Sequence, residues 1–356
     1  MRSRGLLRLL VFGILPFLAV GVRPAEPTDS DLHAEREHRH LRGTVDQLLE
    51  LAKGPFAIGH RGFGDNLGED PSRPIENTVP AVRKGFMAGV SVVEVDVQLT
   101  KDGEIAVFHD DLLSDFTCLN RLTLSELQAR LPFVPSLQAV LNQARKFNQP
   151  SGPLSGLVIV ELKAAAPLCD PDDTQEHAIV AAVTRVIRRM GMTDQVMLTS
   201  LSPALLYLAD AEAPEITRIL SISGLQLMTA AQIEALLGFP VTVIEKRLGL
   251  GLQWAEVGPI FRLPGYSSVA QVLSTAAITT RVRVVEADLF FFFFLLESAG
   301  PQAGAQFVDT LHGSGLKALG FTATNPAEWF FLESLGLDGI YTSDIPFGVA
   351  NQALIP

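Results

Sequence analysis

The chain has 356 residues, of which 47% are hydrophobic and 19% are charged. This composition provides enough apolar material for a sizeable core and excludes an intrinsically disordered protein. The formal net charge of −11 argues against broad nucleic-acid binding, which needs a basic face. It does not exclude an anionic substrate, because a metal ion and local cations can reverse the field within one cleft.

The first 21 residues have the composition of a secretory signal peptide. Arginines lie within or beside the apolar run Leu6–Val20, and the small residues Ala19 and Gly21 are spaced like a cleavage site. A retained membrane anchor is the alternative, but the run is short for a span of ~20 residues and Pro16 interrupts it. We therefore expect an exported protein, periplasmic or extracellular. Export makes a disulfide between Cys118 and Cys169 possible, but their positions in the sequence do not show one.

Residues 22–52 are expected to form a linker followed by a helix. The segment 23–31 is rich in proline and acidic residues, and apolar residues over 32–52 lie on one side of a helical pattern. Gly54 and Pro55 end this helix. The remaining residues, 53–356, are predicted to form one large domain.

Eight short apolar runs, most of them β-branched, alternate with helical patterns from residue 56 onward. Near-continuous apolar runs are typical of parallel strands that are covered on both faces. Eight such strands with helical connections predict a (β/α)8 TIM barrel, an α/β fold, with a doubly wound sheet as the alternative. The runs are Phe56–His60, Ser91–Gln98, Leu157–Lys163, Val196–Leu201, Ile216–Ser223, Arg281–Leu289, Leu316–Ala323 and Gly339–Asp344, and helical patterns include Glu176–Met190, Gln302–Ser314 and Pro326–Leu335.

Two additions to the barrel are predicted. The sequence from Thr100 to Gly103 is typical of a hairpin turn, which would return residues 104–109 alongside the second strand as a β-hairpin extension. The stretch 224–280 is long for one connection, and it contains a strand-like run, Val241–Lys246, and a glycine- and proline-rich part, Gly249–Gly265. We interpret this stretch as an insertion of unknown role.

Five consecutive phenylalanines, Phe290–Phe294, follow the sixth barrel strand. The segment is too short to span a bilayer. Its simplest interpretation is the buried start of a helix beside the barrel. The alternative is an apolar wall near the substrate or a peripheral membrane contact.

Ionisable residues gather at the carboxyl ends of the first strands, where TIM-barrel active sites are built. Because side chains alternate along a strand, Glu94 and Asp96 face the same side, and so do Glu161 and Lys163. Three converging carboxylates repel one another unless a cation compensates, and hard divalent cations such as Ca²⁺ and Mg²⁺ prefer oxygen ligands. Each acid taken singly could be only a helix cap, but their joint occurrence at strand ends favours a functional site.

Cationic and proton-exchanging side chains accompany these acids. Arg61 and Lys163 would suit a phosphate oxygen. His60 and His109 belong to the residue type that most readily exchanges a proton near neutral pH. A lone histidine in a strand is more often structural. The prediction that these two are functional therefore depends on the acids and cations beside them.

Short blocks that contain these residues follow one another in a distinctive order. They are Gly59-His60-Arg61-Gly62, Glu76-Asn77-Thr78, Glu94-Val95-Asp96-Val97, Leu99-Thr100-Lys101-Asp102-Gly103, Val107-Phe108-His109-Asp110 and Glu161-Leu162-Lys163. Their order and spacing resemble the signature of the glycerophosphodiester phosphodiesterase family. The similarity covers about residues 56–346, and its first blocks are the most specific.

The resemblance implies a role for each candidate residue. His60 and His109 would be the general acid–base pair, and Glu94, Asp96 and Glu161 would hold one divalent cation, Ca²⁺ or Mg²⁺. Arg61 and Lys163 would bind the phosphate, Glu76 would support the metal or the substrate glycerol, and Asn77 would orient its neighbours. Phe321 stands where family members often carry tryptophan, so it keeps an apolar ring beside the substrate and lacks the indole donor.

The activity implied is hydrolysis of a glycerophosphodiester, a small-molecule substrate, to glycerol 3-phosphate and an alcohol. A phospholipase D-like activity on lysophospholipids is the alternative, for which Phe290–Phe294 could supply an apolar wall. A catalytically inactive binding protein on the same barrel is a third interpretation, which the presence of both histidines disfavours.

Overall fold

Eight parallel strands close into a barrel in the computed structural model, which describes residues 43–149, 152–166, 168–172, 174–227, 268–278 and 281–353. The strands are β1 (Phe56–Gly59), β2 (Val92–Leu99), β4 (Leu157–Leu162), β5 (Val196–Ser200), β6 (Thr217–Ile222), β7 (Val282–Asp288), β8 (Lys317–Ala323) and β9 (Gly339–Thr342). Each pairs with its neighbours, and β1 pairs with both β9 and β2, which closes the ring. The predicted TIM barrel is therefore confirmed. Each of the eight predicted runs corresponds to one of these strands, and β2 extends one residue beyond its run, to Leu99.

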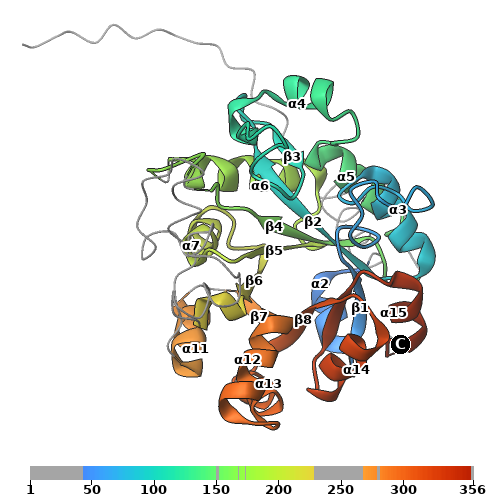
Figure 1. Ribbon diagram of the computed structural model, residues 1–356, viewed down its shortest axis with the longest axis vertical. Coiled ribbons are helices and arrows are strands. Elements are labelled where there is room, and N and C mark those ends of the chain that lie inside the picture. The colour runs from blue at the N-terminus through green and yellow to red at the C-terminus, as the bar shows by residue number, and fades with distance from the viewer. Residues whose placement is uncertain are drawn as a thin grey trace, which may run out of the picture. The chain divides into compact units, whose positions relative to one another are not determined.

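Helices surround this ring of strands (Figure 1). They are α3 (Val79–Ala88), α4 (Leu124–Arg130), α5 (Leu137–Arg145), α6 (Glu176–Met190), α7 (Pro203–Glu212), α11 (Val269–Ile278), α12 (Leu289–Ala299), α13 (Ala303–Gly313), α14 (Pro326–Ser334) and α15 (Ile345–Asn351). The three predicted helical patterns are found as α6, α13 and α14, with ends that differ by at most one residue. Helix α6 ends at Gly191, whose φ of 65° is a left-handed conformation that glycine adopts without strain.

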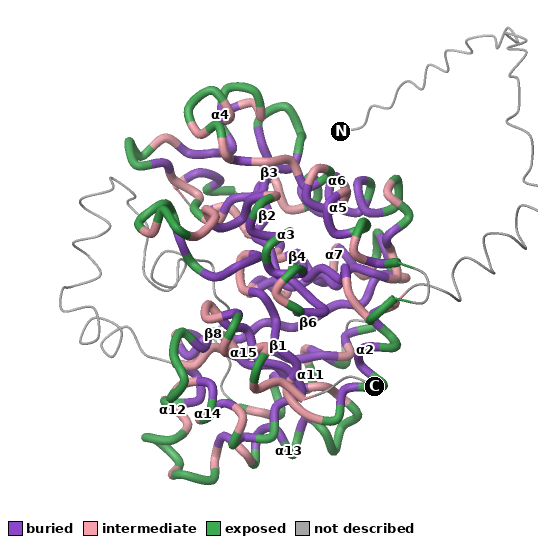
Figure 2. Tube along the Cα trace, turned by 90° about the vertical axis from the view of Figure 1, so that its right-hand side faces the viewer, coloured by how far each residue is buried: buried purple, intermediate pink, exposed green. Residues whose placement is uncertain are grey.

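Alternation of side chains along the strands divides the core into two layers. In β2, Val92 belongs to the apolar cluster inside the barrel, whereas Val93 and Val95 belong to the cluster between the strands and the helices. Glu94 and Asp96 therefore continue the inward side of β2, as predicted. Figure 2 shows the strands buried at the centre and exposed stretches on the surrounding helices.

A short helix, α2 (Val45–Leu51), covers the amino-terminal end of the barrel. Thr44 caps it, and its buried Leu48 joins the cluster that also contains Phe56 and Ile58 from inside the barrel. The first part of the predicted helix 32–52 and the predicted signal peptide lie outside the described residues. None of the helices among the residues described is both long and apolar enough to cross a membrane.

The two predicted additions to the barrel have different outcomes. Strand β3 (Ile105–Val107) runs antiparallel to β2, with Val97 opposite Val107, so the hairpin extension is confirmed. It is followed by the one-turn helix η1 (Leu119–Arg121). Within 224–280 the structure describes the short helix η2 (Gly224–Leu227) and α11, whereas the runs Val241–Lys246 and Gly249–Gly265 lie outside the described residues.

The phenylalanine run forms the first turns of α12. Phe291 and Phe292 are buried and both pack against Phe307 of α13. Phe293 is 39% exposed and stacks on Phe331 of α14, with 5.0 Å between ring centroids. The interpretation as the buried start of a helix therefore holds for Phe291 and Phe292.

Candidate active site

Three carboxylates converge at the carboxyl end of the barrel. Glu94 and Asp96 come from β2 and Glu161 from β4, and one oxygen of each lies within 4.8 Å of the others. The strand register explains this convergence, because Asp96 and Glu161 are directly paired across the parallel ladder. Glu94 and Asp96 are buried, and Glu161 is partly exposed.

The three carboxylates have unequal surroundings. Burial raises the pKa of Glu94 well above its usual value, and the nearby charges of Asp96 and Glu161 raise it further. The Oε1 atom of Glu94 is buried without a hydrogen-bond partner. Burial alone would also raise the pKa of Asp96, but Lys163, His109 and Arg61 hold it well below its usual value. A cation near Glu94 would therefore offset the repulsion among the three carboxylates and give the Glu94 Oε1 atom a partner.

Two basic side chains lie beside these acids. The Nζ atom of Lys163 is 3.0 Å from Asp96 and 2.7 Å from Glu161. The guanidinium of Arg61 donates to Glu76 at 2.7 Å, while its backbone N–H donates to Glu94 at 2.9 Å. Burial would lower the pKa of both bases, but the neighbouring carboxylates raise it, so both remain cationic.

Glu76 and Asn77 lie behind the site and hold its other members in place. Asn77 donates from Nδ2 to Asp96 at 2.7 Å and accepts the Asp96 backbone N–H at 3.0 Å. Glu76 accepts hydrogen bonds from Arg61 and from the backbone N–H of Asn66. Neither Glu76 nor Asn77 is among the residues that line the cavity described next.

A cavity of about 250 Å³ opens at this end of the barrel. The predicted site residues that line it are His60, Arg61, Glu94, Asp96, His109, Glu161, Lys163 and Phe321. Predicted site residues from different strands and loops thus line the same cavity. No phenylalanine of the run 290–294 is among the described residues that line it.

Each histidine at the cavity has a carboxylate on its Nδ1 atom. Nδ1 of His60 lies 2.7 Å from Asp65, and Nδ1 of His109 lies 2.6 Å from Asp110. Nε2 of His60 lies 4.0 Å from Glu94. A carboxylate on Nδ1 fixes the orientation of the ring and makes Nε2 the nitrogen that exchanges a proton with a substrate.

Further carboxylates of this site, Asp65, Asp111 and Glu286, were not predicted from the sequence. Glu286 interrupts an apolar strand, and it also lines the cavity together with Thr199 and Tyr341. A charged residue at an inward position of β7 was a signal that could have revealed it. Asp65 lies in an irregular loop after Gly62 and carries no comparable sequence signal.

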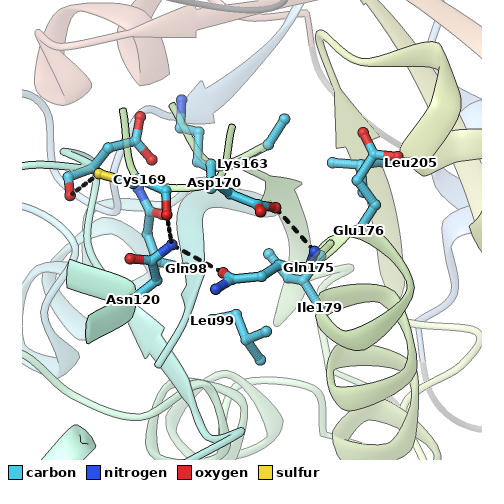
Figure 3. Close-up of a pocket in the computed structure, with 13 residues that line it drawn as sticks. Gln98, Leu99, Asn120, Lys163, Cys169, Asp170, Gln175, Glu176, Ile179 and Leu205 are labelled. Atoms are coloured by element: carbon cyan, nitrogen blue, oxygen red, sulfur yellow. Dashed lines mark hydrogen bonds between the residues drawn. The ribbon is translucent and has the colours of Figure 1, made fainter. Parts of the chain in front are cut away.

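A disulfide ties together two loops beside the site. Cys118 follows the loop after His109 and pairs with Cys169, 51 residues away, in the loop after Lys163. The side chain of Asn120 donates to the Cys169 carbonyl and to Gln175, each at 3.1 Å (Figure 3). The pairing that the sequence left open is therefore present, and it anchors both loops to the same part of the barrel.

Comparison with known proteins agrees with this architecture. Residues 60–346 match the profile described as "Glycerophosphoryl diester phosphodiesterase family". A glycerophosphocholine phosphodiesterase from Schizosaccharomyces pombe is 40% identical over 77 residues, which is 21% of this chain and 7% of that protein. The Bacillus subtilis protein YqiK is 29% identical over 176 residues, or 45% of this chain and 64% of that protein. The chain thus spans less than two thirds of the length of these curated relatives.

Solved structures share the fold. A structure from Silicibacter pomeroyi has a TM-score of 0.60 at 20% identity, covering 85% of this chain and 95% of that one. A phosphodiesterase from Oleispira antarctica, solved in complex with the product sn-glycerol-3-phosphate, has a TM-score of 0.53 at 20% identity. That alignment covers 83% of this chain and 96% of the other. At these identities the likeness concerns the fold.

Proposed function

This chain belongs to the glycerophosphoryl diester phosphodiesterase family, and on that premise we propose that it hydrolyses glycerophosphodiesters to glycerol 3-phosphate and an alcohol. The observation that carries the proposal is the composition of one cavity. Two histidines, the cationic side chains of Arg61 and Lys163, and three converging carboxylates all line it. This set can carry out phosphodiester hydrolysis, because it offers groups to bind the phosphate, to accept a proton and to donate one.

The carboxylate cluster fits a hard divalent cation, Ca²⁺ or Mg²⁺, held by Glu94, Asp96 and Glu161. Two observations support the fit: the three oxygens lie within 4.8 Å of one another, and a buried oxygen of Glu94 has no partner. Ligation by oxygen alone favours these ions over zinc. When bound, such a cation would polarise a phosphoryl oxygen and offset the charge that develops on it.

Arg61 and Lys163 are the residues we assign to the phosphate. Both are cationic, both line the cavity, and both lie against Asp96 of the carboxylate cluster. Their charges would attract the phosphodiester and stabilise its equatorial oxygens as negative charge grows. The contacts to Glu76 and Asp96 restrict these long side chains before substrate arrives, which lowers the entropic cost of binding.

His60 and His109 are assigned the proton transfers. One removes a proton from the attacking hydroxyl, and the other protonates the alkoxide that departs when its bond to phosphorus breaks. In the net reaction the water oxygen forms a bond to phosphorus, the bond between phosphorus and the alcohol oxygen breaks, and the alcohol takes up a proton. The carboxylates on Nδ1 would stabilise whichever ring carries the extra proton.

The lysophospholipid alternative depended on an apolar wall supplied by Phe290–Phe294. Phe291 and Phe292 are instead used in the core, and none of the five residues lines the cavity in the described part of the chain. The remaining exposed ring, Phe293, stacks on Phe331. We therefore favour the water-soluble glycerophosphodiester, and a peripheral membrane contact has no support from these positions.

Side-by-side assays test the proposed function. The purified protein, supplied with Ca²⁺ or Mg²⁺, is given glycerophosphocholine or lysophosphatidylcholine, and the phosphomonoester product is quantified. We expect glycerol 3-phosphate from the first substrate at the higher kcat/KM. A preference for lysophosphatidylcholine would favour the lipid alternative, and release of neither product would refute the phosphodiesterase proposal.

We also propose that the protein is exported. The proposal rests on the composition of residues 1–21, with arginines within or beside the apolar run and the small residues Ala19 and Gly21 at its end. A disulfide between Cys118 and Cys169 is in keeping with an oxidising compartment.

A further inference from the structure

Glu286 is a buried carboxylate at the cavity that the proposed mechanism does not use. It comes from β7, is 3% exposed and lines the cavity across from the strands that carry the acidic cluster. In the register of the barrel it pairs with Ser221 of β6 on one side and Leu319 of β8 on the other. Its position is therefore fixed by the sheet, not by a mobile loop.

The partners of Glu286 are uncharged hydroxyl groups. Thr199 Oγ1 donates to one carboxylate oxygen at 2.6 Å, and the Tyr341 hydroxyl donates to the other. Among the described residues, no lysine, arginine or histidine forms an ion pair with it, unlike Asp96 and Glu161, which share Lys163. Burial raises the pKa of Glu286 to about 7 although these hydrogen bonds oppose the shift.

An acid in this environment is costly for a purely structural residue. The layer below it contains apolar side chains such as Val284 and Leu319, which fill the barrel without any such cost. Hydroxyl partners do not neutralise a carboxylate in the way that Lys163 neutralises Asp96. A ligand that completes the hydrogen bonding of Glu286 would explain why an acid occupies this position.

The two sides of the cavity suit different parts of a substrate. Arg61 and Lys163 present positive charge, which fits a phosphate. The side formed by Glu286, Thr199 and Tyr341 presents hydrogen-bond donors and acceptors without a cation, which would repel a phosphate and fits alcohol hydroxyls. The rings of Tyr341 and Phe321, 5.8 Å apart, supply apolar surface for the carbon chain that carries those hydroxyls.

We propose that Glu286, with Thr199 and Tyr341, forms the subsite that recognises the hydroxyl groups of the substrate's glycerol end, and that Glu286 is its specificity-determining residue. This inference rests on the proposed function, because it assumes that the phosphate lies at Arg61 and Lys163. The glycerol end then lies on the floor of the cavity, and the leaving alcohol points toward the opening. Selectivity resides in the hydroxyls, since a propyl chain of equal length leaves the buried polar groups unpaired.

Binding of two phosphomonoesters tests the inference without requiring turnover. Glycerol 3-phosphate and propyl phosphate have the same charge and chain length, and they differ only in two hydroxyls. Calorimetric titration of the Ca²⁺- or Mg²⁺-supplied protein should give a preference of about tenfold or more for glycerol 3-phosphate. In Glu286→Leu this preference should fall to within about twofold while the affinity for propyl phosphate is retained. Glu286→Gln, which can still donate and accept, should keep part of the preference.

A matched control is available on the same strand. Asp288 is partly buried, but it caps α12 and is not among the described residues that line the cavity. Asp288→Asn should therefore retain the full preference for glycerol 3-phosphate. Equal weakening of both ligands in Glu286→Leu would indicate a structural residue, and an unchanged preference would place the hydroxyl subsite elsewhere. Either result would overturn the inference.

A cationic headgroup is the rival ligand, because Glu286 forms no ion pair with the described residues. If Glu286 bound such a group, Glu286→Gln would raise KM for glycerophosphocholine but not for glycerophosphoethanol, and the preference between the two phosphomonoesters would persist. That pattern would also overturn the inference. Failure of the proposed function is separable, because it would appear as absent turnover of glycerophosphocholine by the wild-type protein.

Discussion

Oδ1 of Asp65 lies 2.7 Å from Nδ1 of His60, so a residue of the loop after β1 fixes the ring of a histidine at the cavity. Burial alone would raise the pKa of Asp65, but the hydrogen bond to His60 and the charge of Arg61 lower it to about 2. Asp65 is therefore ionised at neutral pH and serves as a permanent acceptor for His60. The pair resembles His109 and Asp110 at the same cavity, where the hydrogen bond to His109 lowers the pKa of Asp110.

Removal of Asp65 is expected to impair turnover without loss of the fold. Asp65→Ala should lower kcat by about tenfold or more, because the His60 ring loses the group that orients it. Asp65→Asn should recover part of that loss, since its amide oxygen can still accept from Nδ1. Steady-state kinetics over a pH range would check this, with Asp115→Asn on the exposed loop as a control. Unchanged kcat in Asp65→Ala would show that His60 needs no such partner.

The two histidines are expected to be separable by their leaving groups. His60→Ala and His109→Ala should each lower kcat by ~10²–10⁴-fold on glycerophosphodiesters. A p-nitrophenolate leaving group needs little protonation, so the variant that lacks the general acid should recover much of its rate on that substrate. The variant that lacks the general base should not recover. His312→Ala, whose ring faces Asp338 away from the cavity, should stay near wild type.

Comparable rates for wild type, His60→Ala and His109→Ala would refute the assignment of both histidines. Unfolding curves of the variants are needed beside the kinetics, because a structural histidine would produce lost stability with only a modest loss of rate.

Divalent cations are expected to be required for turnover and to stabilise the protein. Chelation should abolish glycerophosphodiester hydrolysis, and added Ca²⁺ or Mg²⁺ should restore it. The same ions should raise the Tm of the chelator-treated protein, since they bind the folded carboxylate cluster and relieve its repulsion. Glu94→Gln should reduce this thermal shift. Full activity of the dialysed, chelator-treated protein would contradict the proposed metal requirement.

Glu286 is expected to make the protein less stable as pH rises from about 4.5 to about 7. Its pKa is about 7 in the folded protein and has an ordinary value of 4.5, so the folded state holds the proton more tightly. The resulting stability is fully present below pH 4.5 and is lost as the pH approaches 7. Glu286→Gln cannot titrate, so its free energy of unfolding relative to wild type should increase across this range, by on the order of 3 kcal/mol.

Urea denaturation of wild type and Glu286→Gln at pH 5 and pH 8 measures this difference directly. The difference in free energy of unfolding between the two proteins cancels the contributions of the titratable groups that both contain. A pH-independent difference would show that the Glu286 carboxyl titrates alike in the folded and unfolded chains.

The mature protein is expected to begin near Val22. Cleavage after Gly21 would follow from the small residues Ala19 and Gly21 that end the apolar run. N-terminal sequencing of protein recovered outside the cytoplasmic membrane would check this. Recovery of a cytosolic protein that retains Met1 would refute the export proposal.

The barrel and most of its site could be predicted because local signals specify them. Runs such as those containing Val158 and Val284 are apolar on both faces, and strand ends in a barrel of this kind meet at one opening. The spacing of Glu94 and Asp96 then sufficed to place both carboxylates inside. No knowledge of distant contacts was needed for these inferences.

The remaining members of the site depend on contacts that the sequence does not encode locally. Asp65 reaches His60 only because the intervening loop turns tightly, with Gly64 at a φ of 84° and its N–H bonded to the His60 carbonyl. A side chain at Gly64 would collide with the Ser343 backbone, so the turn also depends on the residue that follows β9. Likewise, the partners of Glu286 come from β5 and β9, 87 and 55 residues away.

Helix α2 covers the end of the barrel that lies opposite the active-site cavity. In the described part of the chain its buried side, including Leu48, packs into the apolar residues at that end. Under the proposed function, the substrate and both products would therefore use the opening at the carboxyl end of the barrel. With the glycerol end bound at the proposed Glu286 subsite, the freed alcohol would lie nearer that opening and depart first, and glycerol 3-phosphate would depart last. Depth in the barrel would thereby set the order of product release, and the last product to leave would occupy the place that the next substrate needs.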